Sequence, residues 1–190
     1  KTLKKLKIFK TTDGKLLSAE TSKIFFSLAD NKKEYSFTED FELIDKKTFP
    51  EAWPEGDNQQ FFTELGIKKE NPKDIINTIN ESYKDNLKFS HKKMIEHMAY
   101  IQKNKDCIDE EIFKNNNFKF LSDTNAVISL VDIYIGRAYG NEDFNTLIDE
   151  AKIDTHFLSP DYFKDNEIGV EEWRFFFDSL GISSSFRFVY

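Results

Sequence analysis

An internal repeat constrains this chain more than any other feature of its sequence. Residues 61–67 read FFTELGI, and residues 176–182 read FFDSLGI. A recurrence of this kind indicates that one structural unit has been used twice within the chain. The order of the predicted elements agrees around the two segments, so we place the two copies at residues 7–67 and 118–182.

The first copy opens with the pattern of a β-hairpin. Two mainly apolar segments, residues 6–9 (LKIF) and 16–19 (LLSA), lie on either side of Asp13 and Gly14. Asp-Gly favours a hairpin turn because both residues tolerate positive φ. Residues 24–26 (IFF) predict a further strand.

The first copy closes with a predicted helix over residues 58–65. Phe61, Phe62 and Leu65 share one face of this helix. Gly66 suits the left-handed position that ends many helices, and Ile67 can then pack back onto the last turn. The sequence therefore predicts both the helix and its end.

The second copy repeats this order. Strands are predicted at residues 118–121, 126–128 and 133–136, and a helix from Glu171 ends at residues 180–182. The alignment places Leu121 on Phe9, Asn125 on Asp13, and Tyr134 on or beside Phe25.

The segment between the copies has the signals of helices. Asn71 is a good N-cap before Pro72, and Ser90 is predicted to cap a second helix that runs to about Gln102. A third, weaker helix is predicted over residues 109–114. We therefore expect an α+β fold of two related units, each a small β-sheet with a terminal helix, joined by a helical connector. The predicted segments are residues 1–70, 71–115 and 116–190.

Composition and charge restrict the class of partner. The chain has 20 Phe among its 190 residues, which favours a core rich in aromatic side chains. Residues 1–105 contain 20 Lys and Arg against 17 Asp and Glu, whereas residues 106–190 contain 7 against 17. A nucleic-acid surface needs clustered cations, so the acidic second half disfavours this class of partner.

The sequence also bears on the compartment. Cys107 is the single cysteine, so the chain cannot form an intramolecular disulfide, and this fits a reducing compartment. No apolar run approaches the roughly 20 residues of a membrane span. We expect a cytoplasmic protein with no membrane partner. Because the chain begins with Lys1 and ends within an apparent strand, we also expect it to be part of a longer protein.

No pattern of catalytic or metal-binding residues is apparent. His91 and His97 are six residues apart, so one helix face cannot present both to a metal ion. Cys107 is interpreted as a small buried side chain, and Ser159, which precedes Pro160, is interpreted as a turn or cap residue. The paired carboxylates are explained by helix dipoles and solvation. We expect no catalytic, cofactor or metal site.

Three segments of the second copy form a pattern of their own: residues 134–136 (YIG), 157–162 (FLSPDY) and 172–182 (EWRFFFDSLGI). This pattern resembles one that recurs in very large sacsin-like proteins, which carry a GHKL-type (gyrase and histidine-kinase-like) ATPase domain elsewhere in the chain. Residues 11–15 (TTDGK) and 24–26 (IFF) of the first copy are similar to the same pattern in weaker form, but Asn58 stands where the second copy has Trp173. None of the seven glycines forms a phosphate-binding motif. The resemblance thus implies a repeated region outside the ATPase domain.

We therefore expect a non-catalytic scaffold or protein-interaction segment of a larger sacsin-like cytosolic ATPase protein. Its partners would be other proteins or other domains of the same chain. The residues expected to carry this role are the apolar helix faces and helix-ending glycines of the two copies: Phe61, Phe62, Leu65, Gly66, Trp173, Phe176, Phe177, Leu180 and Gly181. The face of the second helix is interpreted as core, with an exposed partner-binding face as the alternative. The alternative functions are an independent peptide- or nucleic-acid-binding module and a small hydrolase that uses carboxylates.

Overall fold

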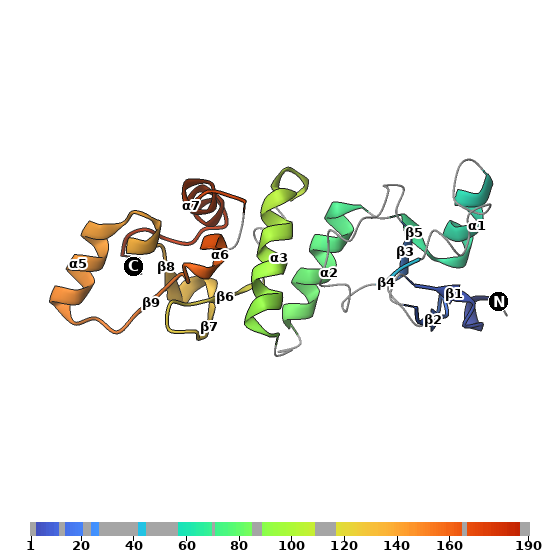
Figure 1. Ribbon diagram of the computed structural model, residues 1–190, viewed down its shortest axis with the longest axis horizontal. Helices are drawn as coiled ribbons and strands as arrows, with labels where there is room; N and C mark the ends of the chain where they lie inside the picture. The colour runs from blue at the N-terminus through green and yellow to red at the C-terminus, as the bar shows by residue number, and fades with distance from the viewer. Residues whose placement is uncertain are drawn as a thin grey trace, which may run out of the picture. The chain divides into compact units, whose positions relative to one another are not determined.

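The structure is a computed structural model that describes residues 3–11, 14–20, 24–26, 42–44, 57–69, 71–84, 89–108, 117–164 and 167–186. The chain forms two compact units, Lys1–Ile79 and Asn80–Tyr190, and the boundary between them falls inside one helix. Both units combine helices with short strands (Figure 1), which confirms the predicted α+β class. The division at residues 70 and 115 stays a prediction.

The described part of unit 1 holds one 3-10 turn, short strands and a nine-residue helix before the helix that crosses the unit boundary. Its elements before the boundary helix are η1 (Leu3–Lys5), β1 (Phe9–Lys10), β2 (Leu16–Leu17), β3 (Ile24–Phe26), β4 (Glu42–Leu43), α1 (Asp57–Leu65) and β5 (Lys68–Lys69). Strands β1 and β2 form the predicted antiparallel hairpin. Its turn includes Gly14, whose φ of 88° is the positive value that the sequence predicted for an Asp-Gly turn.

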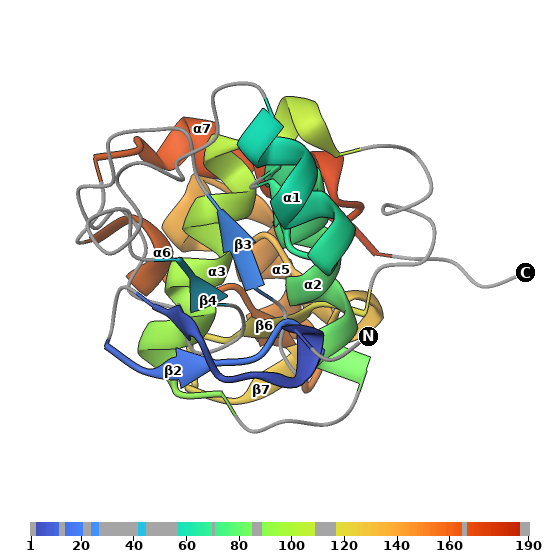
Figure 2. The same ribbon diagram turned by 90° about the vertical axis from the view of Figure 1, so that its right-hand side faces the viewer.

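A second small sheet of unit 1 is built around β3. This strand pairs in parallel with β4 and with β5, and β3 and β4 lie side by side in Figure 2. An isolated antiparallel bridge between Thr11 and Ile44 links the hairpin to this sheet. The sequence predicted one sheet per unit, whereas the described residues of unit 1 form two small sheets joined by a bridge.

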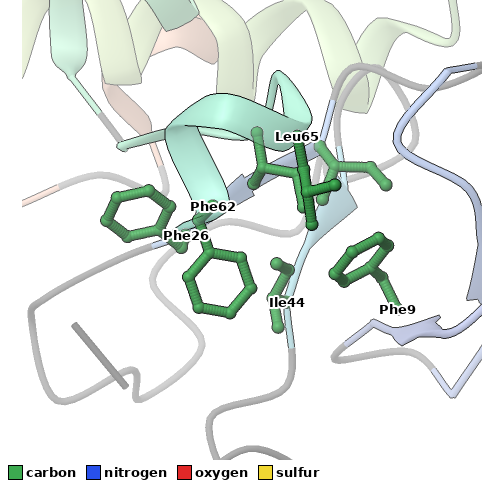
Figure 3. Packing of buried hydrophobic residues seen from close by; sticks show 7 residues of the cluster. Phe9, Phe26, Ile44, Phe62 and Leu65 are labelled. Atoms are coloured by element: carbon green, nitrogen blue, oxygen red, sulfur yellow. The ribbon is translucent and has the colours of Figure 1, made fainter. Parts of the chain in front are cut away.

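The core of unit 1 lies where the hairpin, the β3 sheet and helix α1 meet (Figure 3). Phe62 from α1 lies with its ring centre 5.7 Å from Phe26 and 6.2 Å from Phe9. Ile44 and Leu65 complete the labelled set, and all five side chains are buried. Burying aromatic rings removes large apolar areas from water, and this burial stabilises the unit.

Helices α2 (Pro72–Lys84) and α3 (His91–Lys103) begin where the sequence predicts. The Lys73 amide donates to Asn71 Oδ1 at 3.1 Å, and the Lys93 amide donates to Ser90 Oγ at 3.3 Å. Each contact provides a partner for an amide that the first helical turn leaves unpaired. The predicted helix over residues 109–114 lies outside the described residues.

Unit 2 contains the end of α2, helix α3 and a second set of strands and helices. After η2 (Lys105–Cys107), these are β6 (Lys119–Leu121), β7 (Val127–Ser129), η3 (Leu130–Asp132), β8 (Ile133–Tyr134), η4 (Arg137–Tyr139), α5 (Glu142–Ala151), β9 (His156–Phe157), α6 (Asp161–Lys164) and α7 (Val170–Ser179). The hairpin β6–β7, strand β8 and helix α7 were predicted. Helices α5 and α6 and strand β9 were not.

The strands of unit 2 pair in the same order as those of unit 1. Strands β6 and β7 form an antiparallel hairpin, and β8 pairs in parallel with β9. A bridge between Ser122 and Leu158 links the hairpin to β9, and a parallel bridge joins Tyr134 to Ser183 after α7. These contacts correspond to Thr11–Ile44 and Phe25–Lys68 in unit 1.

These pairings determine which positions of the two units are equivalent. Because Thr11 and Ser122 make the same bridge, Phe120 corresponds to Phe9. Asn125, with a φ of 62°, corresponds to Gly14. The alignment of the hairpin from sequence, which placed Leu121 on Phe9, was therefore shifted by one residue. The alignment of Tyr134 with Phe25 agrees with the strand pairings.

Candidate functional site

The second copy of the repeated heptapeptide lies in an aromatic cluster of unit 2. Phe177 on helix α7 lies at its centre, with ring-centre distances of 5.2 Å to Trp173, 5.1 Å to Tyr162 and 5.8 Å to Tyr139. Trp173 and Phe177 are stacked, whereas the two tyrosines meet Phe177 edge to face. Both arrangements are favourable for aromatic pairs. The cluster therefore joins α7 to α6 and η4.

The two tyrosine hydroxyls of this cluster bind the backbone of neighbouring segments. The Tyr162 hydroxyl accepts the Leu121 amide at 2.8 Å, and the Tyr139 hydroxyl donates to the Ser159 carbonyl at 2.6 Å. Burial raises the pKa of both hydroxyls. For Tyr139, the nearby Tyr162 and Asp161 add to this rise in pKa. The hydroxyls are therefore neutral hydrogen-bonding groups of the core.

The predicted residues of α7 are buried in unit 2. Trp173, Phe176, Phe177 and Leu180 are each at most 3% exposed. The Trp173 Nε1 atom is also buried and has no hydrogen-bond partner in the described part of the chain. These four side chains therefore form core in this structure and not an exposed face for a partner.

The corresponding residues of α1 differ at one position. Phe62 and Leu65 are buried, as Phe177 and Leu180 are, but Phe61 is 47% exposed whereas Phe176 is 2% exposed. Phe176 packs against Trp173 with a ring-centre distance of 5.7 Å, and the first copy has Asn58 in place of this tryptophan. The similar heptapeptides therefore have different surroundings.

Gly66 and Gly181 end their helices in the same way. Their φ angles are 88° and 91°, a region that side chains other than glycine rarely adopt. The Ile67 amide donates to the Phe62 carbonyl, and the Ile182 amide donates to the Phe177 carbonyl. With the matching bonds of the glycine amides, this is the Schellman motif. The structure confirms the predicted left-handed helix end at Gly66.

Sequence reasoning missed a third glycine that the structure requires for a different reason. Gly136 has an ordinary φ of −109°, but a Cβ atom there would lie 2.6 Å from Phe157 Cδ1 and 2.7 Å from Asn145 Oδ1. Asn145 also accepts the Arg137 amide. No local sequence signal identifies Gly136, because the crowding side chains come from residues much later in the chain.

The histidine and serine side chains that were considered as catalytic or metal-binding residues make contacts typical of a structural role. His97 is fully buried, and its Nδ1 lies 3.1 Å from the Tyr83 hydroxyl. Ser159 Oγ accepts the Asp161 amide at 3.2 Å, which agrees with its interpretation as a turn residue. Within the described ranges, no group of three or more His, Cys, Asp and Glu side chains could hold a metal ion.

Comparisons with protein-family profiles, with curated protein sequences and with solved structures found no match to this chain. Among the described helices, none combines the length and the apolar character that crossing a membrane requires.

Proposed function

We propose that this chain is a non-catalytic scaffold segment built from two copies of one α+β unit. In this proposal the chain belongs to a larger sacsin-like cytosolic ATPase protein and connects that protein to protein partners or to its other domains. The ATPase assignment rests on the resemblance of residues 134–136, 157–162 and 172–182 to the sacsin-like pattern.

The shared strand order of the two units is the observation that carries the scaffold proposal. In unit 1, Thr11 follows the first hairpin strand and forms a bridge with Ile44, the residue after β4. In unit 2, Ser122 follows the first hairpin strand and forms a bridge with Leu158, the residue after β9. In both, the helix ends in Leu-Gly-Ile, and the next residue pairs with the central strand. Repetition of one unit is typical of proteins that present extended binding surfaces.

The role of the aromatic residues supports the same proposal. Phe9 and Phe62 pack together in unit 1, and their counterparts Phe120 and Phe177 pack with ring centres 6.1 Å apart in unit 2. The matching residues of the two copies thus serve the cores. The copies differ at Phe61, which is 47% exposed where its counterpart Phe176 is buried, and in our proposal such exposed residues are where a scaffold would contact its partners.

The mass of the endogenous protein tests this proposal. An antibody raised against these 190 residues would be used to blot native lysate and to purify the detected polypeptide for peptide sequencing by mass spectrometry. We expect a polypeptide far larger than 22.4 kDa whose peptides include a GHKL-type ATPase domain. A large polypeptide without such a domain would contradict the sacsin-like assignment but leave the scaffold role. A band at about 22 kDa would contradict membership of a larger protein.

A further inference from the structure

The hairpin of unit 1 has an outer face that is both apolar and basic. Phe9 is buried on the inner face, whereas Ile8 is 41% exposed and Leu16 is 55% exposed. Leu3 and Leu6, just before the hairpin, are 50% and 46% exposed. Ile8, Lys10 and Leu16 lie on the face opposite Phe9. We call these residues, together with the exposed leucines and lysines just before them in the chain, the hairpin patch: Leu3, Lys4, Lys5, Leu6, Lys7, Ile8, Lys10 and Leu16.

In the equivalent hairpin of unit 2, strand β6 is buried on both faces, although Val127 of β7, the counterpart of Leu16, is 50% exposed. Phe120 and Leu121 are consecutive and therefore point to opposite faces of β6, yet both are fully buried. Helix α3 packs against β6, and the Tyr162 hydroxyl binds the Leu121 amide. Lys10 corresponds to Leu121 and is exposed. Helix α3 thus lies against strand β6 in unit 2, whereas Ile8, Lys10 and Leu16, which are described on the outer face of the unit 1 hairpin, are exposed.

Helix α5 of unit 2 has a surface that complements the hairpin patch. Phe144 and Ile148 face the core of their unit, while Leu147 is 50% exposed. Asp143 and Glu150 are also exposed, and Ile153 and Asp154 follow the helix with Ile153 43% exposed. The outer surface of α5 therefore combines exposed aliphatic side chains with carboxylates, whereas the hairpin patch combines them with lysines. We call this set (Asp143, Leu147, Glu150, Ile153 and Asp154) the α5 surface.

We propose that the hairpin patch binds the α5 surface of a second copy of this chain. Contact between two hairpin patches would place lysines against lysines, and contact between two α5 surfaces would place carboxylates against carboxylates. Opposite charges therefore select a head-to-tail contact between different surfaces. A single contact of this kind leaves one patch and one α5 surface free, so association can continue into a ring or an open chain of copies. This inference goes beyond the proposed function and does not depend on the ATPase assignment.

Sedimentation velocity of the complete chain tests the proposal. At about 0.01 M salt, where the Debye length is about 30 Å, we expect dimers and larger species that increase with protein concentration. At about 1 M salt, where this length is about 3 Å, association should weaken. A chain that stays a monomer over the whole concentration range at low salt would overturn the proposal.

Charge reversal on the two surfaces identifies the contact. The Lys7→Glu/Lys10→Glu variant should associate at least about fivefold more weakly than the unchanged chain. The same weakening is expected for the Asp143→Lys/Glu150→Lys variant. A mixture of the two variants should associate again, because each then offers the opposite charge to the other. If the mixture stays as weak as its components, these two surfaces do not bind each other.

A matched control separates a specific contact from net charge. Lys92→Glu/Lys105→Glu changes the net charge as Lys7→Glu/Lys10→Glu does, at exposed positions outside the patch. This control should associate like the unchanged chain, and equal weakening would overturn the proposal.

Leu16→Ser should also weaken association, whereas Val131→Ser, at a position 64% exposed, should not. Binding of a monomeric chain to phosphatidylserine vesicles would instead assign the patch to an anionic lipid surface.

Discussion

Replacing Gly181 tests the helix end on which the two copies agree. The Gly181 φ is 91°, and a Cβ atom added there would meet no atom within 4 Å. A substitution therefore costs backbone strain and no steric overlap. For an ordinary L-residue the left-handed region costs about 1–2 kcal/mol, so Gly181→Ala should lower the free energy of unfolding by about that amount.

The rank order of the stability losses that different substitutions cause at Gly181 is more informative than the loss for one variant. Asn adopts the left-handed region more readily than Ala, so Gly181→Asn should cost less, below about 1 kcal/mol. Gly181→Val should cost more than about 2 kcal/mol, because a β-branched residue is an outlier in this region. Gly66, with a φ of 88°, should show the same order.

Gly136 provides the contrasting case within the same unit. Its φ of −109° suits any residue, but an added Cβ atom would overlap Phe157. Gly136→Ala should therefore cost about 1–3 kcal/mol as overpacking, and Gly136→Asn should cost at least as much because Asn is larger. The order of Asn and Ala is thus reversed between Gly136 and Gly181.

Urea unfolding monitored by tryptophan fluorescence measures these differences. Trp173 is buried in the aromatic cluster of unit 2, so its emission should change when that unit unfolds. The free energies are comparable only where the slope against urea is unchanged, and circular dichroism checks for a coincident transition. Asn and Ala variants of equal stability at Gly181, or a Gly181→Ala change below about 0.5 kcal/mol, would refute the reasoning.

Two further predictions concern the aromatic core. Phe177→Ala should destabilise by about 3–5 kcal/mol because the ring is fully buried, whereas Phe175→Ala, at a position 69% exposed, should change stability by less than about 0.5 kcal/mol; similar losses in urea unfolding would contradict the burial of Phe177. Burial raises the pKa of Tyr139 and of Tyr162 above the usual value of about 10, so the unfolded chain loses these protons first as the pH rises. The contribution of each tyrosine to the free energy of unfolding should be fully present below about pH 10 and then fall by about 1.4 kcal/mol per pH unit. Tyr162→Phe should make this fall with pH less steep. If the free energy of unfolding, measured with urea at pH 10 and pH 11, falls equally in both proteins, the prediction is wrong.

Part of the candidate site could be predicted because it depends on neighbouring residues. The helix end at Gly66 requires a positive φ and hydrogen bonds that reach back at most five residues. The helix starts after Asn71 and Ser90 depend on side chains that bind amides two or three positions ahead. Sequence reasoning can detect these features because the interacting groups are close together in the chain.

Other features were missed because the sequence signal was weak or nonlocal. Strands β4, β5 and β9 contain two residues each, too few to show an alternating pattern. Helix α5 did carry a usable signal, since Glu142 and Asp143 occupy its first turn and Phe144 and Ile148 lie four positions apart on its buried side. No local sequence signal indicated that position 136 must be glycine, because the side chains that would crowd a Cβ atom there belong to Asn145 and Phe157.

The sequence by itself determined the α+β class, the hairpins and the helix boundaries near Asn71, Ser90, Gly66 and Gly181, because local backbone preferences and hydrogen bonds set each of these features. Only the tertiary structure decided which similar side chains are buried. Phe176 is buried beside Trp173, whereas Phe61, its counterpart, is 47% exposed. The parallel pairing of β3 with β4 and β5 was also decided by the tertiary structure, because residues distant in sequence must meet before either contact can form.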